Sequence, residues 1–167
     1  MICSSHSPTA SLTNVKVVPT NDIVIPSPGG TTSGCECRTS PRPPAAPSQL
    51  IQRGTCAFTQ KLDNAVAAGA AGVIRFNEGD TPGRQNALFR SASPGYKLPA
   101  VLPSFAVGHE LSNAYTAGQN PTVNLATNGV DEQKLYPNVV AETTRGDPNH
   151  MVLLGAHLDS VPAGPGV

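Results

Sequence analysis

The sequence predicts a loop-rich β or α+β domain with small side chains, and its length and composition support this prediction. The 167 residues suit one domain, or one domain and part of another. The 16 glycines and 17 prolines make up about a fifth of the chain, against roughly 12% in an average globular protein. Charged residues account for 13%, about half the usual share, and tryptophan is absent. This composition excludes a coiled coil, a helical bundle and a charged disordered tail.

The charges predict neither a nucleic-acid nor a membrane partner. The 11 Lys and Arg residues balance the 11 Asp and Glu residues, and no basic patch stands out. The longest weakly polar stretches, residues 65–74 and 98–107, have about half of the roughly 20 residues that a bilayer span requires. The first residues lack the basic and apolar regions of a signal peptide. We therefore expect a cytosolic protein, or a chain whose natural start is not Met1.

The four cysteines leave two alternatives open. No Cys-x-x-Cys has a matching second pair, so a structural zinc knuckle is not expected. Either all four are free thiols, or Cys35 and Cys56 form a disulfide, which would imply an oxidising compartment. The pairing of Cys3 and Cys37 stays open in both cases.

The first third of the chain predicts little regular structure. Residues 1–14 are polar and without pattern, whereas residues 15–18 and 22–25 are typical of short strands, each closed by a proline. Residues 28–34 form a glycine-rich loop. Residues 37–49 contain four prolines and no large apolar residue, so we expect an exposed, mobile segment that pairs with no strand.

A strand, a helix and a second strand follow. Residues 50–52 predict a strand, and a helix is expected to begin near residues 55–57. Apolar residues repeat along that helix with a period of 3.6, at Phe58, Leu62, Ala65, Val66 and Gly69. Its solvent-facing side would carry Gln60, Lys61, Asp63 and Asn64. A left-handed glycine, Gly69 or Gly72, would end the helix before a strand at residues 72–76, which completes a compact βαβ-like unit.

The remainder predicts shorter elements. Residues 78–96 form a long polar loop, and Pro99 and Pro103 keep residues 98–107 extended. A helix over 109–117, stopped by Gly118, precedes a strand at 122–126. Two further strands, 138–143 and 151–156, flank a polar turn and predict a β-hairpin. The second strand runs into His157 and Asp159, a pattern typical of the edge of a site.

Two segments resemble the protease-associated domain. The motif Leu-Ile-Gln-Arg-Gly-Thr-Cys-Ala-Phe-Thr-Gln-Lys at residues 50–61, with Asn-Ala-Val-Ala-Ala-Gly-Ala-Ala-Gly-Val-Ile at 64–74, is similar to the centre of that domain. The motif Leu-Pro-Ser-Phe-Ala-Val-Gly at 102–108 resembles its later strand and helix. The resemblance covers residues 15–128 and implies a small β-barrel or sandwich with flanking helices, as found in proteases and sorting receptors. The separation of Cys35 and Cys56 is the one this family shows, which favours the disulfide.

The last segment resembles the opening of secreted di-zinc aminopeptidases. The motifs are Asn-Val-Val-Ala-Glu-Thr at residues 138–143 and Val-Leu-Leu-Gly-Ala-His-Leu-Asp-Ser-Val-Pro-Ala-Gly-Pro-Gly at 152–166. The resemblance implies that His157 is a zinc ligand and that Asp159 orients it. A carboxylate on the second ring nitrogen keeps a ligand imidazole neutral and aimed, and residues i and i+2 of a strand share a face. Residues 135–167 would thus begin an α/β zinc-peptidase domain, and residues 1–14 would be a linker or a peptidase-domain remnant.

The sequence departs from these families at two places. It ends before the motifs that supply the bridging aspartate, the Glu-Glu pair and the second histidine, and one histidine cannot hold a catalytic zinc. We therefore expect the chain as given to be inactive and to bind zinc weakly. Relatives have acidic and aromatic residues where this chain has residues 37–49. The right length with a different composition is what a compensated reading-frame shift would produce.

Three functional hypotheses follow. The first is part of a secreted or extracytoplasmic aminopeptidase that uses two zinc ions to remove N-terminal residues from peptide or protein substrates. The second is a non-catalytic protease-associated module that binds peptides or partners, although such a module has no need of residues 138–167. The third is a defective gene fragment. The sequence predicts neither a substrate side-chain preference nor an oligomeric state.

Overall fold

A computed structural model of the chain describes most of its residues. These are residues 2–3, 7–25, 30–36, 46–88, 96–129, 135, 137–143, 145–147, 149–150 and 152–156. The chain divides into two compact units, Met1–Glu132 and Gln133–Val167.

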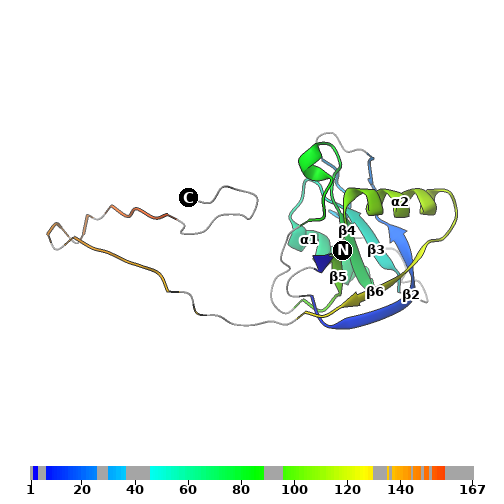
Figure 1. Ribbon diagram of the computed structural model, residues 1–167, viewed down its shortest axis with the longest axis horizontal. Coiled ribbons are helices and arrows are strands. Elements are labelled where there is room, and N and C mark those ends of the chain that lie inside the picture. Colours follow the sequence, from blue (N-terminus) through cyan, green and yellow to red (C-terminus); the bar gives the residue numbers. More distant parts are fainter. Residues whose placement is uncertain are drawn as a thin grey trace. The chain divides into compact units, whose positions relative to one another are not determined.

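The first unit is built on one mixed sheet of six strands in the order β1-β5-β4-β3-β2-β6 (Figure 1). The four inner strands, β5, β4, β3 and β2, run parallel to one another. At the two edges, β1 pairs antiparallel with β5, and β6 pairs antiparallel with β2. The strands are β1 (Ile2–Cys3), β2 (Ala10–Pro19), β3 (Ser48–Gln52), β4 (Gly72–Phe76), β5 (Ala100–Leu102) and β6 (Thr122–Thr127).

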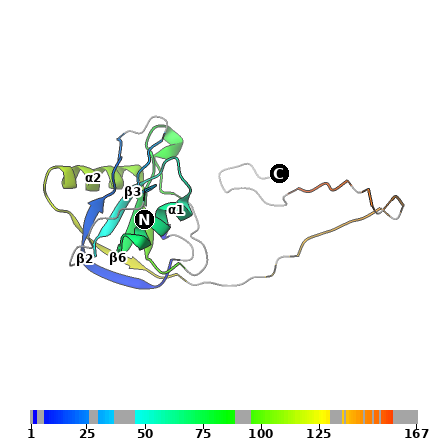
Figure 2. The same ribbon diagram turned by 180° about the vertical axis from the view of Figure 1, so that it is seen from behind.

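Two helices cover opposite faces of this sheet, as Figures 1 and 2 show from the two sides. On one face, α1 (Phe58–Ala67) packs against the sheet and encloses a first hydrophobic core. On the other, α2 (Phe105–Thr116) and β6 close a second core. A short 3-10 turn, η1 (Pro82–Arg84), lies between β4 and β5. This arrangement of one mixed sheet and two helices confirms the predicted α+β class. Neither α1 nor α2 is long and apolar enough to cross a membrane.

Alternation along the central strands separates the two cores. Successive side chains of a strand point to opposite faces, so Ile51 joins the α1 side and Leu50 the α2 side. The α1-side core contains Ile51, Leu62, Ala65, Ala70, Val73 and Ala100. The α2-side core contains Val17, Leu50, Ile74, Phe76, Val101 and Leu125.

The βαβ unit predicted from residues 50–76 is confirmed. β3 and β4 are parallel neighbours, paired from Ser48 with Gly72 to Gln52 with Phe76. The helix between them ends where Gly69 adopts a left-handed φ of 70°, and the amide of Ala70 donates to the carbonyl of Ala65.

The N-terminal segment has more regular structure than its polar sequence predicts. β1 pairs with β5, and β2 starts at Ala10 instead of residue 15. The polar residues of β2 are compatible with a strand because most of its side chains are half-buried or exposed. A bulge lies between Leu12 and Val15, where Asn14 has a φ of 53° and its amide donates to the side chain of Asn124.

The predicted strand at residues 22–25 is wrong. Asp22 adopts a φ of 58°, which turns the chain away from β2. The side chain of Gln52 then takes the place of a strand partner for Val24. Its Nε2 donates to the carbonyl of Val24 at 2.7 Å, and its Oε1 accepts from the backbone amide of Val24 at 2.9 Å. Because this pairing comes from a side chain 28 positions away, no local pattern predicts it.

Two boundaries also differ from the prediction. Ser48 and Gln49 were expected in an exposed segment, but they belong to β3. Ser48 is fully buried because it pairs with a neighbouring strand on each side, with Val17 of β2 and Gly72 of β4. Ala46 and Pro47 of that segment are half-buried, and residues 37–45 lie outside the described residues. The second helix begins at Phe105 instead of residue 109, because Pro103 restricts only the residue before it and leaves Ser104 free to precede a helix.

The β-hairpin predicted in the second unit is not formed among its described residues. Residues 138–143 and 152–156 have no strand, although a turn forms where the amide of His150 donates to the carbonyl of Asp147. Val152, Leu153 and Leu154 are each about nine-tenths exposed. A strand gains stability only from a ladder partner, and the described part of this unit offers none.

Candidate functional site

The residues with the strongest sequence prediction, His157 and Asp159, lie outside the described residues, as does Cys37. Of the other histidines, His109 lies within α2 and stacks on Phe105, with ring centroids 5.5 Å apart. His150 is exposed and its Nδ1 lies 2.7 Å from a carboxylate oxygen of Asp147. Within the described ranges, no three His, Cys, Asp or Glu side chains are close enough to hold a metal ion. Among the described residues, the polar groups that the fold brings together lie around the disulfide and the buried charges.

The structure contains the Cys35–Cys56 disulfide that the resemblance favours. It joins the loop at residues 30–36 to the chain just before α1, with the two Cα atoms 5.8 Å apart. Two side chains of α1 also hold the loop. The amide of Gln60 donates to the carbonyl of Cys35 at 3.1 Å, and that of Asn64 donates to the carbonyl of Gly34 at 3.0 Å. This loop is thus fixed on α1 by covalent and polar contacts together.

Lys61 is the third residue of α1 that holds the loop, and it is buried. Its side chain is 2% exposed, and Nζ donates to the carbonyls of Ser33 and of Gln52, the latter at 3.0 Å. The prediction that Lys61 faces solvent is wrong. Burial, with repulsion from the nearby Arg75, lowers the pKa of Lys61 to about 8, and attraction to Glu78 opposes this only in part.

A second buried cation lies beside it on β4. Arg75 is 4% exposed, and its guanidinium carbon lies 3.0 Å above the centre of the Phe58 ring. This geometry allows a cation–π interaction between β4 and the first turn of α1. In the sequence, the only sign of this buried cation is that a charged residue stands inside the otherwise apolar strand Gly72–Phe76.

One buried carboxylate organises the neighbouring loop. Glu78 is 9% exposed, and its oxygens lie 2.8 Å from Nη1 of Arg84 and 3.8 Å from Nε of Arg53. Its backbone carbonyl accepts from the side chain of Gln52. Glu78 therefore links the turn η1 to the end of β3.

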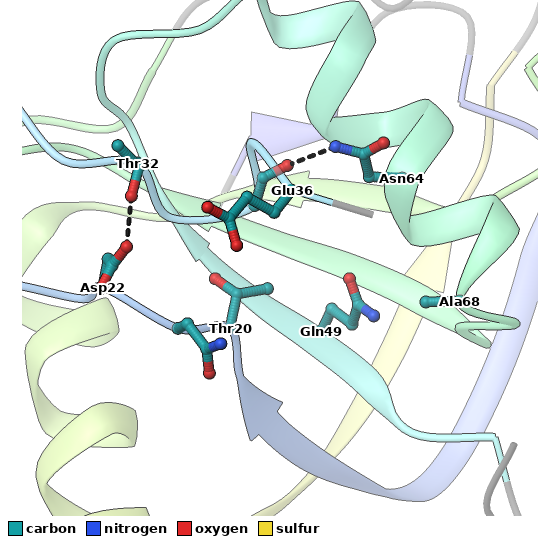
Figure 3. Close-up of a pocket in the computed structure, with 9 residues that line it drawn as sticks. Thr20, Asp22, Thr32, Glu36, Gln49, Asn64 and Ala68 are labelled. Atoms are coloured by element: carbon teal, nitrogen blue, oxygen red, sulfur yellow. Dashed lines mark hydrogen bonds between the residues drawn. The ribbon is translucent and has the colours of Figure 1, made fainter. Parts of the chain in front are cut away.

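Two hollows open beside these groups. The first, shown in Figure 3, lies among the ends of β2 and β3, the disulfide loop and α1. There the Thr32 hydroxyl donates to the Asp22 carboxylate, and Asn64 points to a loop carbonyl (Figure 3). Its volume of about 50 Å³ holds little more than one or two water molecules. It is therefore too small for a peptide side chain.

The second hollow is larger and cationic. Its volume is about 350 Å³, within the usual range of ligand pockets. The side chains of Arg53, Lys61 and Arg75 line it together with those of Phe58 and Leu88, and Cys56 of the disulfide forms part of its wall. It combines positive charge with an apolar surface, which suits an anionic group on an organic ligand.

The comparisons with known proteins agree with this fold. The PA domain family matches residues 15–114. An aminopeptidase of Pseudomonas aeruginosa is 41% identical over 152 residues, which are 91% of this chain and 28% of that protein. A probable leucine aminopeptidase 2 of Aspergillus fumigatus is 38% identical over 120 residues, 71% of this chain and 23% of that protein. The chain thus spans about a quarter of the length of these relatives.

A solved structure shares the same architecture. The aminopeptidase from Aneurinibacillus sp. strain AM-1 superposes with a TM-score of 0.50 at 21% identity, covering 74% of this chain and 26% of that chain. The mixed sheet with one helix on each face is therefore found in a protein of distant sequence. The family match covers more than half of the 167 residues, and we conclude that this chain belongs to the PA (protease-associated) domain family.

Proposed function

We propose that these residues are the PA domain and the first part of the peptidase domain of a zinc-dependent aminopeptidase that removes N-terminal residues from peptides. The observation that carries this proposal is the extent of the similarity to the Pseudomonas protein. Any stretch of 152 residues within a chain of 167 must include residues 16–152. The similarity therefore continues well past residue 114, where the PA match ends. A PA module of another protein class would have no reason to share that continuation.

The proposed division places the PA domain at residues 15–128 and the start of the peptidase domain at residues 135–167. The boundary between the two compact units, at residues 132 and 133, supports this division. Residues 1–14 need more than a linker role, because Ile2–Cys3 and the start of β2 are part of the sheet. We assign them to the same folded unit as the PA domain.

In this proposal His157 is one zinc ligand and Asp159 orients its ring. The described residues contain no cluster of His, Cys, Asp or Glu that fits a metal ion. The 167 residues alone should neither bind zinc tightly nor hydrolyse peptides, because a catalytic zinc needs about three protein ligands. The disulfide favours an extracytoplasmic site of action, since such bonds persist in oxidising compartments.

The test uses the natural protein that contains these residues. We expect it to hydrolyse leucine p-nitroanilide, to lose this activity with a chelator and to regain it with zinc. His157→Ala should abolish the activity, whereas His150→Ala, in the exposed turn, should leave it unchanged. Anilide hydrolysis that persists in the His157→Ala variant would overturn the proposal. The chain of residues 1–167, measured in parallel, should show no turnover and no submicromolar zinc binding by calorimetry.

A further inference from the structure

The cationic hollow beside α1 has features that a purely structural cluster would not need. Two of its cations, Lys61 and Arg75, are at least nine-tenths buried and yet line an open space of about 350 Å³. Burying a charge is costly, and folded proteins usually offset this cost with an opposite charge. Here the Nζ of Lys61 donates to two neutral carbonyls, those of Ser33 and Gln52.

The charged residues that line the hollow, among those the structure describes, are all positive. They are Arg53, Lys61 and Arg75, and the carboxylate of Glu78 close by is shared between Arg53 and Arg84. Burial and, after it, repulsion from Arg75 lower the pKa of Lys61. The space between these cations is therefore a region of positive potential with low-dielectric walls, which strengthens the attraction to an anion.

The first turn of α1 adds to this potential. Thr59 and Phe58 of that turn line the hollow, and the residue before it, Ala57, has no polar side chain with which to cap the helix. The first amides of a helix and its dipole both favour an anion at this end. The helix terminus thus acts together with three cationic residues that line the same space: Arg53 directly after β3, Lys61 on α1 and Arg75 on β4.

The apolar part of the hollow selects among anions. Phe58 and Leu88 form an apolar wall of the hollow. A small inorganic ion bound to the cations would not cover this wall, which would stay in contact with water. An organic anion with a short hydrocarbon stem would cover this wall and place its charge among the cations. A carboxylate on a peptide, either an acidic side chain or the C-terminal group, has this form.

From this geometry we infer that the hollow lined by Arg53, Lys61, Arg75, Phe58 and Leu88 is a carboxylate-binding pocket for peptides. The choice of a peptide as the carrier rests on the proposed function, whereas the choice of a carboxylate rests on the pocket alone. The PA domain would then hold one carboxylate of a peptide while the N-terminal residue is free to reach another part of the protein.

The experiment is a calorimetric titration of the 167-residue chain with four short peptides. One carries a single Glu and a C-terminal amide, one carries Gln in its place, one has a free C-terminus without acidic side chains, and one is the amide of that peptide. We expect saturable binding of at least one carboxylate peptide and none of either neutral peptide. The two carboxylate peptides distinguish an acidic side chain from a C-terminal group as the source.

Arg53→Gln and Arg84→Gln form a matched pair of variants. Both arginines pair with Glu78 and are about one-third exposed, and both variants remove one positive charge, but only Arg53 lines the hollow. Arg53→Gln should weaken carboxylate binding about tenfold, as expected for a lost charge-assisted hydrogen bond, and Arg84→Gln by less than twofold. Arg53→Lys should restore part of the affinity.

Three results would overturn the inference. The first is that neither carboxylate peptide binds at millimolar concentration. The second is that neutral and acidic peptides bind equally. The third is an equal loss of affinity in both arginine variants, which would indicate long-range attraction only. Binding is measured on the chain without hydrolysis, so its failure is distinct from a failure of the aminopeptidase assay. Binding of free acetate as tight as that of the peptides would support the pocket and refute the peptide as its ligand.

Discussion

Removal of the Cys35–Cys56 disulfide should lower the stability of the first unit by about 3 kcal/mol. The two cysteines are 21 positions apart, so the bond closes a loop of 22 residues when both ends are counted. In the chain-entropy model, a loop of this size costs the unfolded chain about 3.4 kcal/mol of conformational freedom at 25 °C. The non-covalent links from Gln60, Lys61 and Asn64 remain in the folded state, so the loop should stay in place while the unfolded chain gains freedom.

Urea denaturation of the oxidised chain and of a Cys35→Ser/Cys56→Ser double variant measures this loss. With an m-value of about 1.5 kcal/mol/M for a unit of this size, the midpoint should fall by about 2 M. A reductant should shift the native chain to the midpoint of the double variant and leave the double variant unchanged. Peptide mapping without reductant should recover the two cysteines in one linked fragment.

The outcome that would refute the reasoning is a loss below about 1 kcal/mol, with free thiols at both positions after expression in an oxidising compartment. The non-covalent contacts of α1 would then suffice to hold the loop, and the argument for an extracytoplasmic protein would lose its structural basis.

Two further changes test the packing of the same unit. Gly108→Ala should destabilise it by about 3 kcal/mol in thermal unfolding, because the new Cβ would lie 2.0 Å from the ring of Phe76, and an unchanged midpoint would refute the close approach of α2 to β4. Stability should rise by about 2 kcal/mol between pH 7 and 9.5, because the folded pKa of Lys61, about 8, lies below its unfolded value of 10.5, so that the unfolded chain binds more protons in this window. Its charged neighbours are Arg75 and Glu78. Lys61→Met should remove the slope, and a slope that persists would assign the effect to another group.

The centre of the first unit was predictable because its signals are local. A 3.6-residue apolar period, a glycine that can adopt a positive φ and a short apolar strand lie within residues 50–76. The structure has the predicted strand, helix and strand there, although β3 already begins at Ser48. Gly118, with a φ of 76°, likewise ends α2 as expected. Backbone conformation near a glycine depends on few neighbours, so such signals survive in the folded protein.

The candidate site was less predictable because its residues are defined by distant contacts. Lys61 fits a polar helix face by residue type, and only the carbonyl groups of Ser33 and Gln52 make its burial possible. Gln52 in turn has the pattern of a strand end, yet its side chain serves as a partner for Val24. The convergence of Arg53, Lys61 and Arg75 on one hollow depends on the register of β3 and β4, which no single segment encodes.

The exposed apolar residues of the second unit support its assignment to a larger domain. Val139, Val140, Val152, Leu153 and Leu154 are each at least three-quarters exposed. Runs of this kind left in water promote edge-to-edge aggregation, so stable proteins bury them in a sheet. Their β-branched and leucine-rich composition is typical of strands buried on both faces, as in the parallel sheets of α/β enzymes. A peptidase domain of that class would provide the covering strands and helices, which a PA domain that acts only as a binding module would not require.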